Sequence, residues 1–313
     1  MKKLFFILIL FLVACGRQQT EIVDPNFRTG TEGLEIKFQT NSPPNEIIER
    51  SSFTLGMEVK NKGATEIKDG LIKISGYGED FTFESDLDTQ STLQRIDSLE
   101  GKSLLYPEGT LPKFFLFRFK NNQRPTSGKG VFNAVACYQY ETLATSEICI
   151  NGKGVDYLNI NQESCNMEQY KSKTFSGQGA PIVITKIEEE ILPRNEQEFD
   201  IVLTIYLDNK GKGNAVKKES HSKKCNEQPI LEDEINKISI DEISFGNARY
   251  STRNGRIDCS TNEVDTSRND KIICRTSRLR NDEGSYVSPL IVRLKYGYNE
   301  VASATVNVKQ ISQ

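Results

Sequence analysis

The sequence predicts an all-β protein built from two antiparallel β-sandwiches in tandem. Almost every periodic segment alternates apolar and polar residues with a period of two, which is typical of half-buried strands. Turn-forming residues separate these short segments. Two stretches of sequence also recur, once in each half of the 313-residue chain, which indicates a duplicated unit.

The chain opens with a short apolar leader that ends at a cysteine. Lys2 and Lys3 give a basic start, residues 4–12 are apolar, and small residues precede Cys15. This order resembles the lipobox of prokaryotic lipoprotein precursors, in which the cysteine is acylated and a peptidase cuts before it. The apolar run is far shorter than the ~20 residues that span a bilayer. We therefore expect residues 1–14 to be a signal peptide and Cys15 the lipidated N-terminus, with a plain signal peptide as the alternative.

Charge and hydropathy narrow the class of partner. Loss of the leader would change the formal net charge from −3 to −5, and no basic stripe occurs along the chain. We therefore expect no nucleic-acid partner. No second long apolar run follows the leader, so the acyl chains would be the only link to the membrane. The expected location is extracytoplasmic, on the membrane surface.

Six cysteines follow Cys15, and an even number in an exported chain predicts three disulfides. A structural metal site is the alternative. The chain has no Cys-x-x-Cys pair and only one histidine, His221, so we expect no metal and no cofactor. Free thiols in the core are a further alternative. The six are Cys137, Cys149, Cys165, Cys225, Cys259 and Cys274.

An internal repeat sets the expected architecture. Residues 138–150 align without a gap with residues 296–308, at an offset of 158. Upstream, residues 53–63 match residues 200–211, and both end in Asn-Lys-Gly, at an offset of 148. The two halves are expected to be duplicates, the second with a net insertion of about ten residues.

Period-two alternation places the individual strands. Each strand that ends in Asn-Lys-Gly stops where glycine supplies the positive φ of a turn. Residues 91–99 are the best candidate for a short helix or a polar loop. Strands are predicted at residues 34–38, 53–59, 71–77, 115–119, 182–187, 201–207, 238–245 and 290–298.

An alternating strand that runs into Asn-x-Gly and on to a second strand resembles the CARDB-like (cell-adhesion-related) modules of prokaryotic surfaces. The matching segments are residues 53–74 and 199–216. The resemblance implies two tandem immunoglobulin-like sandwiches and a place on the cell surface. It carries over no catalytic residue. The chain has no tryptophan, so the antibody-type core is absent.

Composition gives the expected boundaries. Residues 15–33 form the lipidated cysteine and a polar tether, and residues 34–150 the first sandwich. Residues 151–180 are polar and glycine-rich, so they are expected to be a connector, pinned by Cys165. The second sandwich is expected over residues 181–313.

Strand patterns also suggest which cysteines pair. Cys137 and Cys149 flank the repeated segment, so a turn at residues 142–144 would place them opposite each other, within disulfide range. Cys259 and Cys274 lie at the inner ends of two strands and can close a second hairpin. Cys165 and Cys225 then remain, and would tie the connector to the loop after the second Asn-Lys-Gly.

Few side chains suggest catalysis. His221 has Ser220 and Ser222 beside it, but it lies in a lysine-rich stretch, so a solvated loop histidine is favoured over a general base. Asp86 and Asp88 hint at calcium, yet the glycine of an EF-hand loop is missing, and a loop carboxylate pair is the better reading.

The remaining candidates are runs and pairs. The acidic residues 188–190 and 232–234 are expected to be solvated faces. The tyrosines of the repeat share one face of equivalent strands, where they could stack on sugars or contact a protein. Their recurrence in both halves favours a core position. They are Tyr138, Tyr140, Tyr296 and Tyr298.

These observations predict a lipid-anchored surface protein that acts as a binding, adhesion or structural module of the envelope. The partner would be an unidentified surface protein or glycan, bound by residues 16–313 without turnover. One alternative is an envelope hydrolase or enzyme subunit that uses acidic residues. Another is an envelope or pilus assembly factor that presents an open strand edge.

Overall fold

The computed structural model describes residues 27–85, 89–151, 165, 167–195, 198–250, 256–268, 271–280 and 285–310. The leader, Cys15, Asp86, Asp88 and residues 152–164 and 166 of the expected connector lie outside the described residues. The described chain is nearly all β, in three sheets whose strands pair antiparallel with one exception. None of its helices has the length and hydropathy needed to cross a bilayer.

The first half of the chain contributes a four-stranded sheet. Along β3 and β7 buried residues largely alternate with more exposed ones, so one face of the sheet covers the core. In spatial order they are β1 (Leu34–Phe38), β3 (Ser52–Asn61), β7 (Lys113–Asn121) and β5 (Phe81–Glu84).

The second half contributes a six-stranded sheet. Its centre is the long pair β10 (Ile182–Pro193) and β11 (Glu198–Asn209). The rest are β15 (Ile257–Cys259), β17 (Lys271–Thr276), β9 (Ser172–Thr174) and β18 (Leu279–Arg280).

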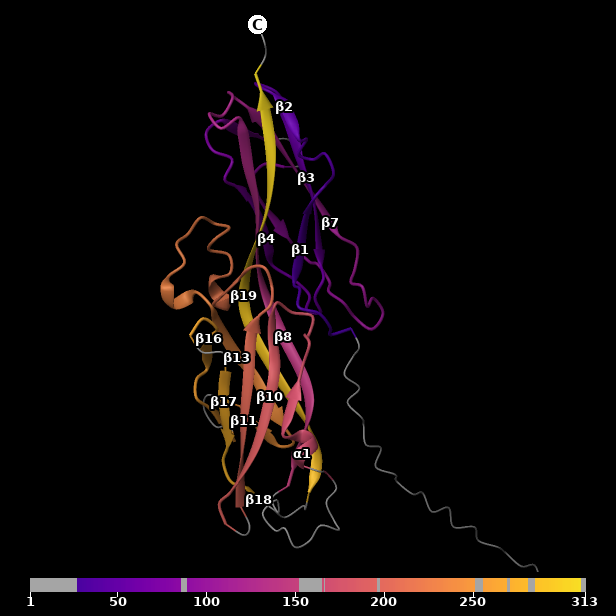
Figure 1. Ribbon diagram of the computed structural model, residues 1–313, viewed down its shortest axis with the longest axis vertical. Coiled ribbons are helices and arrows are strands. Elements are labelled where there is room, and N and C mark those ends of the chain that lie inside the picture. The colour runs from indigo at the N-terminus through magenta and orange to yellow at the C-terminus, as the bar shows by residue number, and fades with distance from the viewer. Residues whose placement is uncertain are drawn as a thin grey trace, which may run out of the picture.

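Both halves share the third sheet, which has nine strands. Its axis is the pair β8 (Lys129–Ile150) and β19 (Tyr286–Lys309), which are antiparallel along the whole of β8. Figure 1 shows these two strands side by side along the length of the molecule, with β1, β3 and β7 around one half and β10, β11 and β17 around the other.

Shorter strands complete the shared sheet on both sides of this axis. They are β4 (Gly70–Ser75), β6 (Leu93–Ile96), β13 (Lys237–Phe245), β14 (Ala248–Arg249), β12 (Asn214–Val216), β16 (Glu263–Asp265) and β2 (Glu46–Ile48), the last of them parallel to β19. The described helices are short: α1 (Met167–Tyr170) and the 3-10 turns Lys218–Ser220 and Glu232–Glu234.

The smaller sheets pack on the shared sheet around one continuous hydrophobic core. In the first half, Phe53 and Phe119 meet Phe132 of β8 edge to face, with ring centroids 5.4 and 5.1 Å apart. In the second half, Leu203 of β11 and Val292 of β19 belong to the same buried cluster. The described core lies between residues 34 and 308, so residues 16–313 contain it without the leader.

The predicted all-β class and most predicted strands are confirmed, and residues 34–38 form β1 with the bounds expected. Residues 91–99 are a correction, because they contain an edge strand, β6, and not a helix or loop alone. The pairing partner β4 supplies the hydrogen bonds that this polar segment cannot make by itself. The predicted boundaries at 150 and 181 stay predictions.

The predicted hairpin within residues 138–150 is wrong. Residues 142–144 contain no turn, because β8 runs straight through them and pairs there with β19, Leu143 opposite Arg293. Twelve residues of extended strand separate Cys137 from Cys149 by roughly 40 Å, so these two cannot bond.

All six cysteines are nevertheless in disulfides. Cys259 bonds Cys274, its register partner on β17, as predicted. The other two expected pairs are corrected: Cys137 bonds Cys225, and Cys149 bonds Cys165. Cys149 lies near the end of β8, where the following chain can turn back to it, whereas Cys225 lies in a loop folded onto the middle of β8. The three bonds indicate an oxidising compartment outside the cytoplasm.

Candidate functional site

The four repeated tyrosines meet where β8 and β19 cross from one half to the other. Tyr138 lies opposite Tyr298 and Tyr140 opposite Tyr296, with Gln139 opposite Gly297 between them. The last two residues are 158 positions apart, which is the repeat offset. A pseudo-two-fold axis therefore passes through this pair and relates the two halves.

In the first half, Tyr140 is locked to the Asn-Lys-Gly turn. Its hydroxyl donates to Asn61 Oδ1 (3.1 Å) and accepts from the Thr65 amide (3.3 Å). Asn61 Nδ2 donates to the Thr65 carbonyl (2.7 Å), which closes the ring. A Cβ at Gly63 would collide with the Tyr140 hydroxyl, so glycine is required at this close approach.

The second half repeats this unit atom for atom. Tyr298 donates to Asn209 Oδ1 (2.9 Å) and accepts from the Gly213 amide (3.0 Å), while Asn209 Nδ2 donates to the Gly213 carbonyl (2.9 Å). A Cβ at Gly211 would meet the Tyr298 hydroxyl. The two recurring sequence segments are thus the two sides of one hydrogen-bonded unit.

The other two tyrosines are equally buried. The Tyr138 hydroxyl accepts from the Leu34 amide (3.1 Å) and the Tyr296 hydroxyl from the Ile182 amide (3.4 Å). Burial raises the pKa of all four phenols, that of Tyr298 to about 12. The expectation that these tyrosines are core residues is confirmed, and they offer no stacking platform.

The pseudo-symmetry is broken beside one tyrosine. Tyr296 contacts Thr142 Oγ1 (3.0 Å), whereas the equivalent Tyr138 interacts electrostatically with the carboxyl of Glu300. Burial raises the pKa of Glu300 to about 7. Glu300 borders a cavity of about 270 Å³ between the halves, with Lys212 among the other lining residues. The carboxyl thus faces a cation across a small polar recess.

His221 lies on the outer face of the shared sheet, over the pseudo-two-fold axis, and forms no catalytic set with its neighbours. Its Cβ packs over Gly297, and Nδ1 lies 2.9 Å from the Lys218 carbonyl. The neighbouring Ser220 hydroxyl donates to Glu234 Oε1 (2.7 Å), away from the imidazole. The Cys137–Cys225 disulfide ties residues 217–236, which lie between β12 and β13 and which we call the inserted segment, to β8. Its position is structural.

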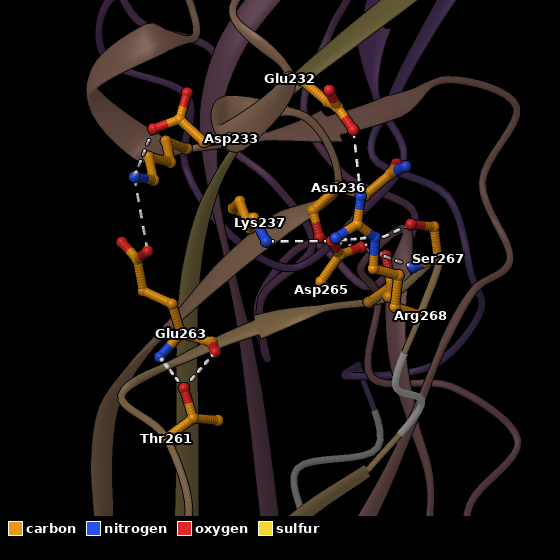
Figure 2. Close-up of polar contacts among 11 residues, drawn as sticks. Glu232, Asp233, Asn236, Lys237, Thr261, Glu263, Asp265, Ser267 and Arg268 are labelled. Carbon is orange, nitrogen blue, oxygen red and sulfur yellow. Dashed lines mark hydrogen bonds and ion pairs between the residues drawn. The ribbon is translucent and has the colours of Figure 1, made fainter.

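The acidic run 232–234 belongs to an ion-pair network. Figure 2 shows Asp265 between Lys237 (3.0 Å) and Arg268 (3.7 Å), with Glu232 on the far side of Arg268 (3.0 Å). The Ser267 hydroxyl, then Lys237, lower the pKa of Asp265 to about 2.

The same network continues to a second cation. Lys217 lies between Asp233 (3.9 Å) and Glu263 (3.6 Å). These carboxylates are therefore compensated by bases of the same chain. Among the described residues no group of three or more His, Cys, Asp or Glu side chains could hold a metal ion.

The acidic run 188–190 departs from the expected solvated face. Glu189 is only 3% exposed, because a bulge between Ile184 and Lys186 turns its side chain inward. Its Oε2 accepts from the Cys149 amide (3.2 Å), while Oε1 has no hydrogen-bond partner. Burial raises the pKa of Glu189 to about 8, so the carboxyl is mostly neutral at pH 7.

A pocket of about 540 Å³ lies over this part of β10. Its lining includes Glu188, Glu189 and Glu190 of β10, Val202 and Thr204 of β11, and Lys171. Its lining mixes both charges.

The sequence analysis missed the most exposed apolar feature. Residues 103–111, between β6 and β7, form what we call the apolar loop, in which Leu104, Leu105, Tyr106 and Leu111 are 76, 84, 56 and 86% exposed. The sequence signal is an apolar run, Leu-Leu-Tyr, that does not alternate and stops at Pro107. Phe114 and Leu116 extend the exposed apolar surface onto the outer face of β7.

Comparison with known proteins gives no family. No protein-family model and no curated protein matches the chain. Among solved structures, the secreted serine protease VesC from Vibrio cholerae matches at 7% identity and a TM-score of 0.21, over 90% of this chain and 52% of that one.

Two further structures match still more weakly. The C-terminal globular domain of an oligosaccharyltransferase from Pyrococcus abyssi matches at 8% identity and TM-score 0.19, over 88% of this chain and 48% of that one. The CupB6 tip adhesin from Pseudomonas aeruginosa matches at 9% and 0.13, over 90% and 96%. The chain spans about half the length of the first two. Scores this low carry no argument about fold or function.

The two tyrosine units predict that equivalent mutations in the two halves destabilise the protein by similar amounts. Tyr140→Phe and Tyr298→Phe each remove a hydrogen bond to an asparagine and one from a backbone amide, so each should lower the free energy of unfolding by about 1 to 3 kcal/mol. Tyr106→Phe, on the exposed apolar loop, is the control and should change it by less than about 0.5 kcal/mol. Denaturant unfolding measures all three, and a cost in only one half would contradict the pseudo-symmetry.

Glu189 predicts a pH-dependent stability. The ordinary pKa of a glutamate is 4.5, and that of Glu189 in the folded chain is about 8. The stability that Glu189 contributes to the folded state is therefore fully present below pH 4.5 and is lost as the pH rises to about 8. Glu189→Gln should therefore unfold like the wild type at pH 4.5 and be more stable by on the order of 2 kcal/mol at pH 8. Glu190→Gln, on the exposed neighbour, is the control. Parallel pH curves for wild type and Glu189→Gln would refute the assignment.

Proposed function

We propose that the chain is a lipid-anchored protein of the extracytoplasmic surface that works by binding and not by catalysis. Its frame would be two immunoglobulin-like sandwiches of the CARDB-like kind. Three disulfides and the leader that ends at Cys15 support this placement. The packed antiparallel sheets support the frame.

The apolar loop is the observation that carries the proposal. Monomeric proteins rarely expose several large apolar side chains together, and where they do the surface contacts another molecule. The loop belongs to a connection between strands of a disulfide-stabilised frame, and binding residues are commonly displayed on such connections. The charged clusters of the described surface, in contrast, are paired within the chain.

The enzyme alternative would rest on Glu189, since a carboxyl with a pKa near 8 could act as a general acid. Glu189 does line the pocket over β10, but its side chain is only 3% exposed and accepts from the Cys149 amide. Ser220 and His221, adjacent in sequence, hydrogen-bond to different groups. Binding is therefore the better supported function.

The assembly-factor alternative needs a long open strand edge. The outer strands of the three described sheets are short, with five residues in β1, four in β5 and β6, and three in β9 and β15. Short edges give a partner strand few backbone hydrogen bonds. Residues 300–306 of β19, however, pair with β8 on one edge and with no described strand on the other, so strand addition there is the alternative against which a loop contact has to be tested.

Replacement of Cys15 tests the anchor. Cys15→Ser removes the sulfur that would be acylated, so the protein should leave the membrane fraction or accumulate as an uncut precursor. Membrane fractionation and intact mass measure both outcomes. A mass and a membrane distribution equal to those of the wild type would refute lipidation at Cys15.

Binding without turnover is tested on residues 16–313, produced without lipid. This ectodomain should sediment with native envelopes, and Leu104→Ser with Leu105→Ser should reduce the bound fraction. The same ectodomain should convert none of a panel of envelope glycans and general hydrolase substrates. Turnover that vanishes in a folded Glu189→Gln variant would replace the binding proposal with an enzyme.

A further inference from the structure

We propose that the apolar loop docks on the surface of a lipid bilayer, next to the anchor of the same chain. This rests on the proposed lipidation of Cys15 and names the partner of the surface described above. The loop would be a second, non-covalent contact with the membrane that holds the anchored protein in one orientation.

The side chains of the loop have the chemistry of an interfacial contact. Leu104, Leu105 and Leu111 are the most exposed large apolar side chains among the described residues. Leucine enters the acyl region readily, and tyrosine, here Tyr106, is enriched at the headgroup level, where its ring is apolar and its hydroxyl is wet. A bilayer accepts all four without requiring a complementary protein pocket.

The backbone of the loop is held in shape before any contact is made. The Ser103 amide donates to the Tyr106 carbonyl (3.0 Å), and the Tyr106 amide donates to Ser103 Oγ (3.1 Å). The Gly109 amide donates to the same carbonyl (3.0 Å), at a positive φ of 80° that favours glycine. The leucines are therefore displayed by an ordered turn, so docking costs little conformational entropy.

The base of the loop touches the segment that leads to the anchor. Lys102 Nζ donates to the Thr29 carbonyl (3.2 Å), and the Lys102 amide donates to the Gly63 carbonyl (2.7 Å). Figure 1 shows the loop between β6 and β7 standing away from the body near the start of the described chain. The loop and the N-terminal segment are thus on the same side of the first half.

Chain length sets the distance to the membrane. Fourteen residues lead from Cys15 to Thr29, and even a fully extended chain of that length spans at most about 50 Å. A lipid on Cys15 would keep Thr29, and with it the base of the loop, within that distance of the bilayer. The high local concentration of membrane would then make even a weak loop contact effective.

Charge around the loop is compatible with this contact but does not drive it. Lys102 and Lys113 flank the loop, and Lys60 approaches Gly109, while Glu100 and Glu108 offset part of that charge. The contact should therefore depend mainly on apolar burial. Neutral vesicles should bind, and anionic lipid should add only a modest gain.

Vesicle flotation of the unlipidated ectodomain, residues 16–313, tests the proposal. The wild type should float with phosphatidylcholine vesicles, and Leu104→Ser with Leu105→Ser should lower the bound fraction at least about fivefold. The matched control is Leu231→Ser with Ile235→Ser, which removes two exposed apolar side chains from the inserted segment of the second half. The control should bind like the wild type, and thermal unfolding should show that all three proteins are folded.

A tryptophan reporter gives a second readout, because the chain has none of its own. Leu105→Trp should show a blue-shifted emission when vesicles are added and should be quenched by brominated acyl chains. Leu231→Trp should show neither change.

The outcomes separate the partner from the function. Failure of the wild type to float with neutral or anionic vesicles, or an equal loss in the control variant, would overturn the bilayer as partner. If binding to native envelopes then remained sensitive to Leu104 and Leu105, the loop would contact a protein or glycan and the proposed function would stand. Loss of envelope binding as well would refute both.

Discussion

Two strands, β8 and β19, pair along all 22 residues of β8, and the other strands are arranged around the two halves of that ladder. Each long strand contributes one part to each half of the molecule, since β4 pairs with residues 133–137 of β8 and β13 with residues 290–295 of β19. Neither half therefore has a complete sheet without a strand from the other. The tyrosines sit where the ladder passes between halves, and each buried hydroxyl needs a partner there. The Asn-Lys-Gly turns supply partners for two of them, for Tyr140 through Asn61 and for Tyr298 through Asn209.

The disulfides protect this arrangement at separate places. Cys137–Cys225 holds the inserted segment, with His221, against the outer face of the ladder at the axis. Cys149–Cys165 closes the chain back on the end of β8, close to Glu189, whose carboxyl accepts from the Cys149 amide. A buried carboxyl is tolerated there because its raised pKa keeps it mostly neutral and one of its oxygens accepts from the Cys149 amide. The frame is thus rigid at its centre and at its ends, and the connections between its strands can vary without cost to the core.

The surface of the frame is chemically uneven. Carboxylates such as Asp265 and Asp200 are matched by cations of the same chain, which leaves little net charge to recruit a ligand. The apolar loop differs, because most of the surface of Leu104 and Leu105 is exposed to water. Any surface that covers these leucines removes apolar area from water, and this lowers the free energy of the bound state. Its contact through Lys102 with Thr29 relates that surface to the N-terminal segment and so to the proposed anchor.

The sequence by itself determined the all-β class and most strand positions, because period-two alternation and turn residues act locally. It also showed the duplication, and the even number of cysteines in an exported chain indicated that all six are in disulfides. It also indicated that Tyr138 and Tyr298 are core residues. Only the tertiary structure decided which strands pair. Residues 138–150 look like a hairpin with themselves, yet they pair with their own repeat, since a strand pattern does not specify its partner and a distant one can satisfy more hydrogen bonds. The pairing of Cys137 and the burial of Glu189 followed from that choice, as did the exposure of Leu104, which depends on whether any other part of the chain packs over it.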